Sequence, residues 1–383
     1  SKGIIRTVLG DIPAEPWGIT NAHAHLVVKA DTTKPPFDST DQAELVMTLN
    51  DSLPELQEFG DAGGFCLVDV TEMGMGRDPE ALVRASEETG VHVVMGTGIY
   101  HEPFHPDAIA DLDDVAIAEL LVKEVTEGVG DTGIRAGIIG EQGTYTGPMT
   151  DREAVVFRAS AMAAVETGVA VTTHTYLGRN ALDQIDVLTS QGLDPDRIVI
   201  GHLDDTEPDL DLIREIINRG AWAQFDTIGY EYYTEVLQVQ MATDVVRAGK
   251  LRQLAEEELT DHVILASDLC RRRHLQGEGG PGLVHLVTGV RALALHASGE
   301  VKGRAWQPLA ARSPFAGSLE QDPLEMWQRS LEVMRQALAL AGLEAADIEG
   351  LGVVNQRSTA LAWDAQTGAP LCSAIGWQDI RTA

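Results

Sequence analysis

The sequence predicts an α/β protein whose larger part is a (β/α)8 barrel of the TIM type. Between residues 18 and 268, short apolar runs alternate with amphipathic stretches, and eight such runs in about 250 residues match the length of this fold. Five of the runs carry histidine, glutamate or aspartate at or within two residues of their carboxyl ends. A parallel barrel brings the carboxyl ends of its strands to one face, so these residues would meet there. A doubly wound sheet is the alternative, but it would not bring the ends of strands 1, 4, 5, 6 and 8 to one centre.

The eight strands are expected at continuous apolar runs, because strands that are buried on both faces lack polar alternation. These runs are Gly18–Leu26, Gly64–Thr71, His92–Tyr100, Ala136–Gly143, Ala170–Thr175, Arg197–Leu203, Ala221–Ile228 and His262–Asp268. Amphipathic stretches lie between them, for example Asp151–Thr167. Thr150 or Asp151 can cap the N-terminus of that helix.

The pattern changes at the glycine-rich stretch Gly277–Gly282, which disfavours a helix. We therefore expect a barrel domain over residues 1–282 and a second part over residues 283–383. Asp322 and Pro323 form a strong helix start for Pro323–Leu340. We expect a β-hairpin before this helix and two strands after it, which together give a ββαββ-like fragment. Their ranges are Val290–Leu295, Glu300–Gln307, Gly350–Asn355 and Thr359–Trp363.

Composition excludes several classes of function. A net charge of −31 argues against nucleic-acid binding, which depends on clustered lysine and arginine. No apolar run reaches membrane-spanning length, and the first residues lack the apolar core of a signal peptide. Cys66, Cys270 and Cys372 are odd in number and far apart, as reduced thiols would be. We expect a cytoplasmic protein that acts on a small molecule and binds neither nucleic acid nor a membrane.

The residues that end the five runs are typical metal ligands. In an extended strand, residues two apart point to the same side, so His23 and His25 would face the barrel mouth together. Each residue alone has a simpler explanation, such as a buried core histidine or an aspartate that caps a helix. Together, four imidazoles and two carboxylates indicate a hydrolytic and binuclear metal site. The expected ligands are His23, His25, Glu141, His174, His202 and Asp268.

With these motifs, the chain from about Thr7 to Gly282 resembles the phosphotriesterase-related metallohydrolases of the amidohydrolase superfamily. The resemblance rests on Thr7-Val8-Leu9-Gly10, His23-Ala24-His25, the stretch 133–141, Thr172-Thr173-His174-Thr175, Gly201-His202, the stretch 224–229 and Ser267-Asp268. It implies that His23, His25 and Asp268 hold the more buried of two metals. It also implies that His174 and His202 hold the more exposed one.

The resemblance further implies a carboxylate that bridges the two metals. In the best-known relatives the bridge is a carboxylated lysine on strand 4, but this chain has no lysine between Lys123 and Lys250. Glu141 stands in its place, as in the branch that bridges with glutamate, and either group offers two oxygens. We expect Zn²⁺ in both positions, with Mn²⁺, Co²⁺ or Fe²⁺ as alternatives.

Such a centre lowers the pKa of a shared water, so that the metal-bridging hydroxide attacks an ester, lactone, amide or phosphotriester. Asp268 is expected to take the proton and pass it outward. Tyr100 matches the position where lactonases of the family place a tyrosine, whereas Thr227 stands where they carry arginine.

The arginines after Asp268 are candidates for substrate binding. Arg271 and Arg272 could recognise an anionic group, although at least two of Arg271, Arg272 and Arg273 are expected to pair with surface acids. Three histidines on mouth-side loops are expected at the surface rather than as ligands; they are His101, His105 and His274.

The last hundred residues resemble the first, actin-like (ribonuclease-H-like) domain of sugar and polyol kinases with the FGGY signature. The motifs are Asp322–Trp327 and the stretches 352–359 and 375–382. By resemblance, Arg357, Trp377, Gln378 and Asp379 would contact a polyol, and Ser358 stands where glycerol-using members carry glutamate. The resemblance covers only about the first fifth of that family. Its catalytic aspartate and ATP-binding domain would lie beyond Ala383, so kinase activity is not expected of these residues.

The junction suggests a gene fusion that replaces the last helix of the barrel. We expect the helix Pro323–Leu340, or the partner in a homodimer, to cover the flank that this helix normally covers. The alternatives to a hydrolase are an impaired fusion product that only binds metal and a sugar-binding, kinase-like module.

Overall fold

The structure is a computed structural model. It describes residues 3–14, 18–31, 44–234, 238–286, 289–295, 301–309, 311–312, 320–348, 362–364, 366–367 and 369–375. The chain divides into two compact units. The barrel unit comprises residues 1–60, 64–254 and 258–286, and the C-terminal unit comprises residues 61–63, 255–257 and 287–383. Each unit is described by itself.

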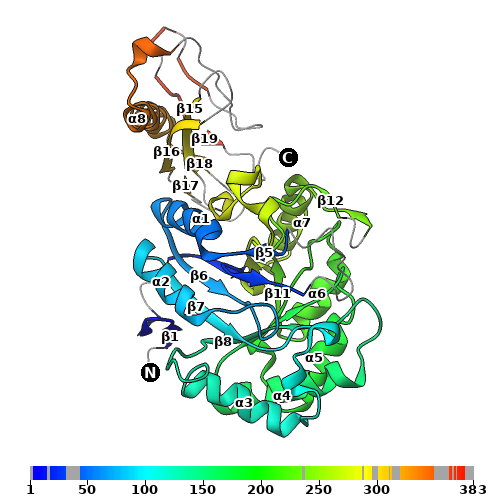
Figure 1. Ribbon diagram of the computed structural model, residues 1–383. Coiled ribbons are helices and arrows are strands. Elements are labelled where there is room, and N and C mark those ends of the chain that lie inside the picture. Colours follow the sequence, from blue (N-terminus) through cyan, green and yellow to red (C-terminus); the bar gives the residue numbers. More distant parts are fainter. Residues whose placement is uncertain are drawn as a thin grey trace. The chain divides into compact units, whose positions relative to one another are not determined.

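The barrel unit contains one eight-stranded parallel sheet with the order β14-β11-β10-β9-β8-β7-β6-β3 (Figure 1). Each strand lies within one of the eight runs that the sequence predicts. The strands are β3 (Ile19–Ala24), β6 (Gly64–Asp69), β7 (His92–Thr97), β8 (Ile138–Gly143), β9 (Val171–His174), β10 (Ile198–Ile200), β11 (Trp222–Phe225) and β14 (Val263–Leu265). The predicted barrel is therefore confirmed.

The ring closes just beyond the two edge strands. A parallel bridge joins Ala24 to Leu269. The N–H of His25 donates to the Leu269 carbonyl at 2.8 Å, and the N–H of Asp268 donates to the His23 carbonyl at 3.0 Å. The closure therefore holds two predicted ligand segments side by side.

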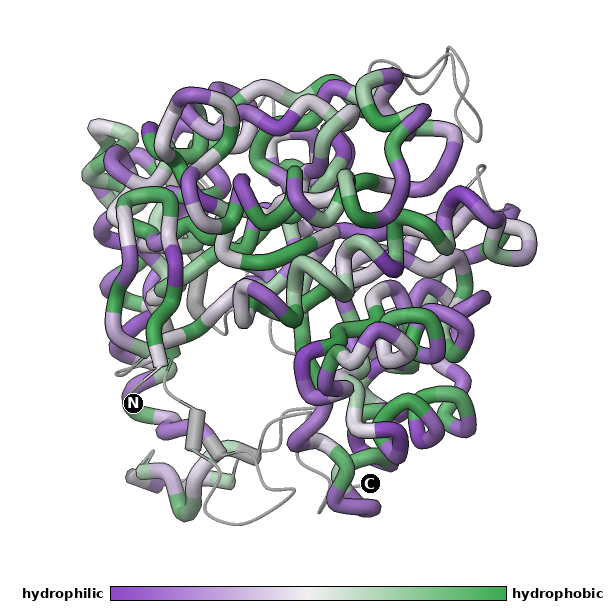
Figure 2. The backbone as a smooth tube through the Cα atoms, turned by 90° about the horizontal axis from the view of Figure 1, so that it is seen from below, coloured by the Kyte–Doolittle hydropathy of each residue, from purple (hydrophilic) through white to green (hydrophobic). Residues whose placement is uncertain are grey.

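Seven helices follow the first seven barrel strands and lie on their outer side (Figure 1). They are α1 (Leu49–Asp61), α2 (Pro79–Thr89), α3 (Asp114–Thr126), α4 (Asp151–Thr167), α5 (Ala181–Ser190), α6 (Leu210–Asn218) and α7 (Asp244–Glu256). Along its helical stretches the chain alternates between hydrophobic and hydrophilic residues (Figure 2), as helices with one face on a sheet should. No helix in the described part of the chain is long and apolar enough to cross a membrane.

The chain after β14 differs from the rest of the barrel. Residues 266–286, all of which are described, contain no α-helix. They form the 3₁₀ turns η5 (Arg272–His274), η6 (Gln276–Glu278) and η7 (Leu283–Leu286).

Helix α4 shows how local sequence sets an element. Thr150 caps it, because the N–H of Glu153 donates to Thr150 Oγ1 at 3.1 Å and Glu153 Oε2 accepts from the Thr150 N–H at 3.0 Å. This reciprocal pair forms a capping box. At the other end, Gly168 adopts φ 83°, a left-handed conformation that favours glycine. The helix has the predicted bounds.

Three short antiparallel pairs in the barrel unit were not predicted. They are β1 (Ile4–Thr7) with β2 (Gly10–Pro13), β4 (Val28–Lys29) with β5 (Val46–Met47), and β12 (Tyr233–Thr234) with β13 (Val239–Gln240). Strands of two to four residues are too short to show a hydrophobic period, so the sequence pattern could not reveal them.

In the C-terminal unit, β15 (Gly289–Leu295) and β16 (Val301–Pro308) form the predicted hairpin. Helix α8 (Pro323–Ala341) is the predicted helix, capped by Asp322 and ended at Gly342. It packs on β16 through a small core of Ala305, Val333 and Ala337. A Cβ at residue 303 would collide with the backbone of Ala337, so Gly303 permits this close approach.

The described C-terminal unit also contains a three-stranded antiparallel sheet of β17 (Ala311–Arg312), β18 (Glu320–Gln321) and β19 (Ala374–Ile375), and the 3₁₀ turn η8 (Ala345–Asp347). The predicted strand Gly350–Asn355 lies outside the described residues. Most of Thr359–Trp363 does as well, and Trp363 forms only an isolated bridge with Pro370.

Candidate metal centre and pocket

The structure places all six predicted ligands at the carboxyl ends of barrel strands. Five strands or the turns directly after them carry the ligands, which is the face where the loops of such a barrel form a site. His23 and His25 belong to β3 and its end, Glu141 to β8, His174 to the end of β9, His202 to the turn after β10, and Asp268 to the turn after β14.

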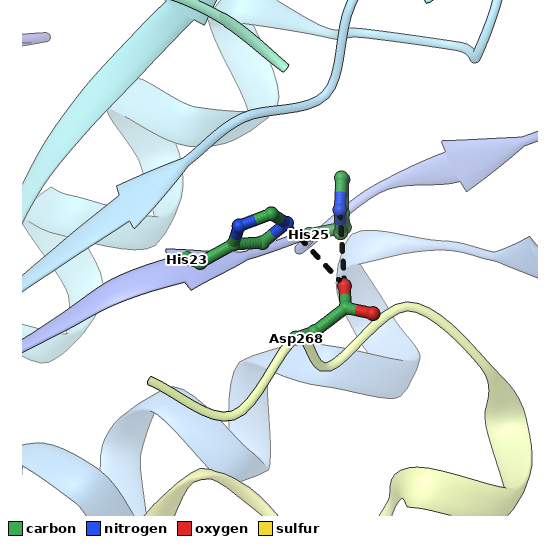
Figure 3. Close-up of side chains that lie close together, drawn as sticks. All are labelled: His23, His25 and Asp268. Carbon is green, nitrogen blue, oxygen red and sulfur yellow. Dashed lines mark ion pairs between the residues drawn. The ribbon is translucent and has the colours of Figure 1, made fainter. Parts of the chain in front are cut away.

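His23, His25 and Asp268 form the first group (Figure 3). Oδ1 of Asp268 lies 3.6 Å from Nε2 of His23 and 3.3 Å from Nε2 of His25. Two ligand atoms of one tetrahedral zinc ion lie about 3.3 Å apart, given metal–ligand distances near 2.0–2.1 Å. The spacing of these three atoms therefore fits a shared cation.

Glu141 lies among all four histidines. Its Oε1 is 2.9 Å from Nδ1 of His174, 2.7 Å from Nε2 of His202 and 3.5 Å from Nε2 of His23. Its Oε2 is 3.9 Å from Nε2 of His25. His23, Glu141 and His202 form a second group that could hold a cation. A carboxylate in this place can bridge two metal positions.

One ring nitrogen in the centre makes no hydrogen bond to the described residues. Nε2 of His23 is buried and has no hydrogen-bond partner among the described residues. A buried polar atom without a partner costs free energy, and a cation between His23 and the two carboxylates would supply that partner. The donor set of four imidazoles and two carboxylates suits Zn²⁺ and similar ions.

The charges of these groups favour cations. Burial raises the pKa of Glu141, but the nearby His174, His23 and His202 outweigh it and lower that pKa well below its usual range. Burial likewise works against ionised Asp268, but the hydrogen bond of His25 and the charge of His23 lower its pKa. Both carboxyls are therefore ionised, as metal ligands must be.

The pKa values of His25 and His202 shift in the opposite direction, whereas burial lowers the pKa of His174. Burial lowers the pKa of His25, but the hydrogen bond and charge of Asp268 raise it to about 9. Burial also lowers the pKa of His202, but Asp226 and Glu141 raise it well above its usual value. A cation that binds these rings would release their protons.

Further hydrogen bonds fix the ring orientations. Nδ1 of His25 lies 2.9 Å from Thr71 Oγ1, and Nδ1 of His202 lies 2.8 Å from Asp226 Oδ1. Nδ1 of His23 lies 3.2 Å from Gln224 Oε1. Such contacts orient metal-binding imidazoles. The sequence pattern did not predict these roles of Thr71, Gln224 and Asp226, although Gln224 and Asp226 belong to the family motif 224–229.

Two ligands have left-handed backbone. His202 has φ 55° and Asp268 has φ 35°. Such conformations cost roughly 1–3 kcal/mol each and persist where surrounding contacts hold them. The His202 N–H donates to the Asp226 carboxylate at 3.1 Å, and the Tyr230 hydroxyl donates to the Asp268 carbonyl at 2.7 Å.

The centre lies in a pocket that is partly open to solvent, and its empty space together with the adjoining open solvent is about 880 Å³. Aliphatic and aromatic side chains form much of its wall, together with a few polar groups. Besides five of the ligands, the wall contains Val28, Leu45, Glu72, Met75, Tyr100, Tyr176, Asp205, Thr227, Tyr230, Tyr232, Thr234, Met241, Cys270, Arg271 and His274. The sixth ligand, His23, is fully buried.

Tyr100 lies against a ligand, as the resemblance implies. Its hydroxyl is 3.3 Å from the ring nitrogens of His174, and the two rings meet edge to face. It also lines the pocket. Burial and the neighbouring Tyr176 raise the pKa of Tyr100 well above its usual value, so its hydroxyl stays protonated and can donate.

The structure separates the three arginines after Asp268. Arg271 lines the pocket. Arg272 does not line it, because its guanidinium pairs with Asp51 and Glu278 at 2.9 Å each. Arg273 pairs with Glu44 at 3.0 Å. Of the two arginines proposed for substrate binding, only Arg271 lies where it could contact a ligand in the pocket.

The expectation that His101 and His274 lie at the surface is wrong. His101 is fully buried and its Nε2 lies 3.1 Å from the Tyr176 hydroxyl. His274 is buried, stacks on Tyr230 and lies 2.8 Å from the Tyr232 hydroxyl. Both sit on mouth-side loops that fold over the barrel, which residue type alone does not reveal. His105 is half-buried and contacts the Tyr100 carbonyl.

The fold and the site together define a (β/α)8 barrel with a candidate two-metal centre of imidazole and carboxylate ligands. The model of the phosphotriesterase family matches residues 3–301, and the chain belongs to that family. The chain is 34% identical over 275 residues to the phosphotriesterase homology protein of Escherichia coli, which covers 72% of this chain and 89% of that protein.

Solved structures and a second relative also support membership of this family. The crystal structure of the Escherichia coli protein with phosphate in its active site aligns with a TM-score of 0.65 at 32% identity, over 72% of this chain and 90% of that one. A lactonase from Listeria monocytogenes aligns with a TM-score of 0.65 at 27% identity, over 73% and 87%. The N-acetyltaurine hydrolase of Salmo salar is 30% identical over 319 residues, covering 76% and 90%. The relatives whose names state an activity include hydrolases.

The C-terminal part also matches the expected family. The N-terminal domain of the FGGY family of carbohydrate kinases matches residues 287–383. The two family matches overlap over residues 287–301, so the match to the barrel family continues past Gly282, where the resemblance was predicted to end. The residues that resemble polyol contacts lie outside the described residues: Arg357, Ser358, Trp377, Gln378 and Asp379.

Proposed function

We propose that the protein is a divalent-metal-dependent hydrolase that cleaves an ester, lactone, amide or phosphotriester. The observation that carries the proposal is the position of Glu141 among four histidines, with Asp268 beside two of them. Two bound cations, for which Zn²⁺ is the first candidate, would lower the pKa of water and polarise the oxygen of the scissile bond.

The residues of the chain have separate parts in this proposal. His23, His25 and Asp268 would hold one cation, His174 and His202 would hold the other, and Glu141 would contribute to both positions. Asp268 lines the pocket and, at 15% exposure of its side chain, has a path to solvent. It therefore takes the proton that water loses and passes it outward.

The wall of the pocket orients the substrate. The Tyr100 hydroxyl beside His174 donates a hydrogen bond to a substrate oxygen, and Arg271 binds an anionic group. Thr227 lines the pocket and accepts a hydrogen bond from the buried Arg247 at 2.9 Å. It stands where the lactonase resemblance implies an arginine, so we expect lactones to be poorer substrates than open-chain acyl compounds.

A substrate panel tests the proposal. Protein reconstituted with Zn²⁺, Mn²⁺, Co²⁺ or Fe²⁺ is assayed with aryl esters, anilides, N-acyl amines, lactones and chromogenic phosphotriesters, and its metal content is measured in parallel. We expect about two ions per chain, as binuclear hydrolases bind, and turnover of at least one class that a chelator abolishes. Turnover that survives both chelation and the change Glu141→Ala would overturn the assigned site.

A further inference from the structure

Glu72 places a buried carboxyl in the pocket wall. It follows β6 and lines the same pocket as His25 and Glu141. The residue is 1% exposed, and neither Oε1 nor Oε2 has a hydrogen-bond partner among the described residues. The other carboxyls of this wall differ, since Glu141 and Asp268 face histidines and Asp205 accepts from the Leu177 N–H at 3.4 Å.

Backbone hydrogen bonds hold the chain around Glu72, but no described residue is in hydrogen-bond contact with its carboxyl oxygens. The Met73 N–H donates to the Gly98 carbonyl at 3.2 Å, and the Met75 N–H donates to the Glu72 carbonyl at 3.3 Å. Val28, Leu45 and Met75 are apolar members of the same wall. A buried carboxyl among such neighbours destabilises the fold unless something else bonds to it. No described residue bonds to it, and an N–H of a molecule bound in the pocket would supply the missing hydrogen bond.

We infer that Glu72 accepts a hydrogen bond from the N–H of a secondary amide, and that the pocket therefore prefers amides to esters and lactones. A carboxyl offers an acceptor oxygen whether or not it is protonated, so this role does not depend on its charge. The inference rests on the proposed hydrolase function. It adds the substrate class and assigns Glu72 as a residue that determines specificity.

The reaction of such a substrate balances without a further reactant. Water supplies a hydroxyl to the acyl carbon, the C–N bond breaks, and the leaving nitrogen takes up a proton to give a carboxylic acid and an amine. Glu72 bonds to the N–H before the reaction and to the amine after it. Esters and lactones have no hydrogen on the corresponding atom, and a site built for a donor discriminates against analogues that lack it.

Matched substrates test the inference. 4-Nitroacetanilide and 4-nitrophenyl acetate differ in the N–H, and N-methyl-4-nitroacetanilide is an amide without it. We expect Glu72→Met to lower kcat/KM for the anilide about tenfold or more, as loss of a hydrogen bond to a carboxylate should, while kcat/KM for the ester and the N-methyl anilide stays unchanged. Glu72→Gln keeps an acceptor oxygen and should lose less. An equal loss on all three substrates would overturn the inference.

Two controls distinguish a role of Glu72 in substrate recognition from a role in metal binding or folding. Metal content should be the same in wild type, Glu72→Met and the exposed-site control Glu119→Met. The chelated Glu72→Met protein should unfold at a higher urea concentration than wild type, because a buried carboxyl without a partner has been removed. A fall in either quantity would show that Glu72 supports the metals or the fold.

A binding measurement distinguishes this inference from the proposed function. If metal-loaded wild type turned over no substrate, the hydrolase proposal would fail, but Glu72 could still be tested by the thermal shift with acetanilide and with phenyl acetate. We expect acetanilide to raise the Tm of wild type more than phenyl acetate does, and this difference to vanish in Glu72→Met. Equal shifts in wild type would refute the assignment.

Discussion

The carboxylate of Asp226 bonds to both the side chain and the backbone of His202. Its Oδ1 lies 2.8 Å from Nδ1 of His202, and both of its oxygens lie 3.1 Å from the His202 backbone nitrogen. Asp226 thus fixes the imidazole ring and also holds the left-handed backbone on which the ring sits. Its own N–H donates to Asp204 at 2.9 Å, and Asp204 pairs with the buried Arg247 at 2.8 Å. The orientation of His202 therefore depends on Asp226 and on the ion pair of Asp204 with Arg247.

Replacing Asp226 by Asn should weaken metal binding without removing a ligand. Loss of the carboxylate behind a metal-binding histidine lowers affinity about 10- to 100-fold. Competition with a chromogenic chelator measures the change, and Asp131→Asn on an exposed loop serves as the matched control. Equal affinities in Asp226→Asn and wild type would show that His202 is not oriented by Asp226 for a metal.

Replacing Glu141 by Gln should remove the bridge between the two metal positions. Since loss of a partner behind a ligand already costs 10- to 100-fold, loss of the shared carboxylate should lower turnover at least about 100-fold. Metal analysis should find fewer ions per chain than in wild type, and His174→Ala should spare the group of His23, His25 and Asp268. Unchanged metal content in Glu141→Gln would contradict a bridging role.

The barrel could be predicted because its strands are continuous apolar runs, and the ligands because they lie at or near the carboxyl ends of those runs. The helix Asp151–Thr167 was predicted to the residue because Thr150 and Glu153 form a local capping box. These signals are local, so no tertiary information was needed.

The sequence could not reveal which loop side chains line the pocket, because loops that are distant in sequence meet there. Glu72 and Asp205 are acidic loop residues that would ordinarily face water, yet folded loops bury both in the pocket wall. His274 was expected at the surface, but it lies under Tyr230 because the turns after β14 fold inward. Arg271 and Arg272 are adjacent in sequence, and only tertiary contacts with Asp51 and Glu278 separate their roles.

Asp205 should make the stability of the metal-free protein depend on pH. Burial, with the charges of Asp204 and Asp226 and against that of His202, raises the pKa of Asp205 to about 7. Its pKa in the unfolded chain is about 3.9. The folded state therefore binds more protons between these values, so this contribution to stability is complete below pH 4 and is lost as pH rises through 7.

The change Asp205→Asn tests the direction of this pH dependence of stability. The amide cannot ionise, so at pH 8 the chelated variant should be more stable than wild type, by up to roughly 4 kcal/mol for a pKa difference of this size. Urea unfolding of both proteins at pH 5 and pH 8 measures the difference. The same loss of stability from pH 5 to pH 8 in both would show that another group is responsible.

The capping box of α4 should contribute measurably to stability. Thr150→Ala removes the side-chain acceptor and should cost about 1 kcal/mol. Glu153→Ala should cost more, because Glu153 is fully buried and also accepts from the Tyr145 N–H at 2.8 Å. Urea unfolding of the two variants checks the order, and a larger cost for Thr150→Ala would contradict it.

Shortening the chain should show where the barrel ends. The residues just after the glycine-rich stretch belong to the barrel unit: Leu283 is fully buried, Val284 is 3% exposed, and His285 pairs with Asp244 at 2.7 Å. A chain that ends at Gly282 loses these contacts, and removal of two buried aliphatic side chains should cost about 4 kcal/mol or more. It should therefore unfold at a lower urea concentration than a chain that ends at Leu286.

The C-terminal unit is tested by comparing the chain that ends at Leu286 with the full chain. If the helix Pro323–Leu340 covers the barrel flank, the shorter chain should unfold earlier, because apolar area would be exposed at about 25 cal/mol per Å². If the two unfold alike, the C-terminal unit does not stabilise the barrel.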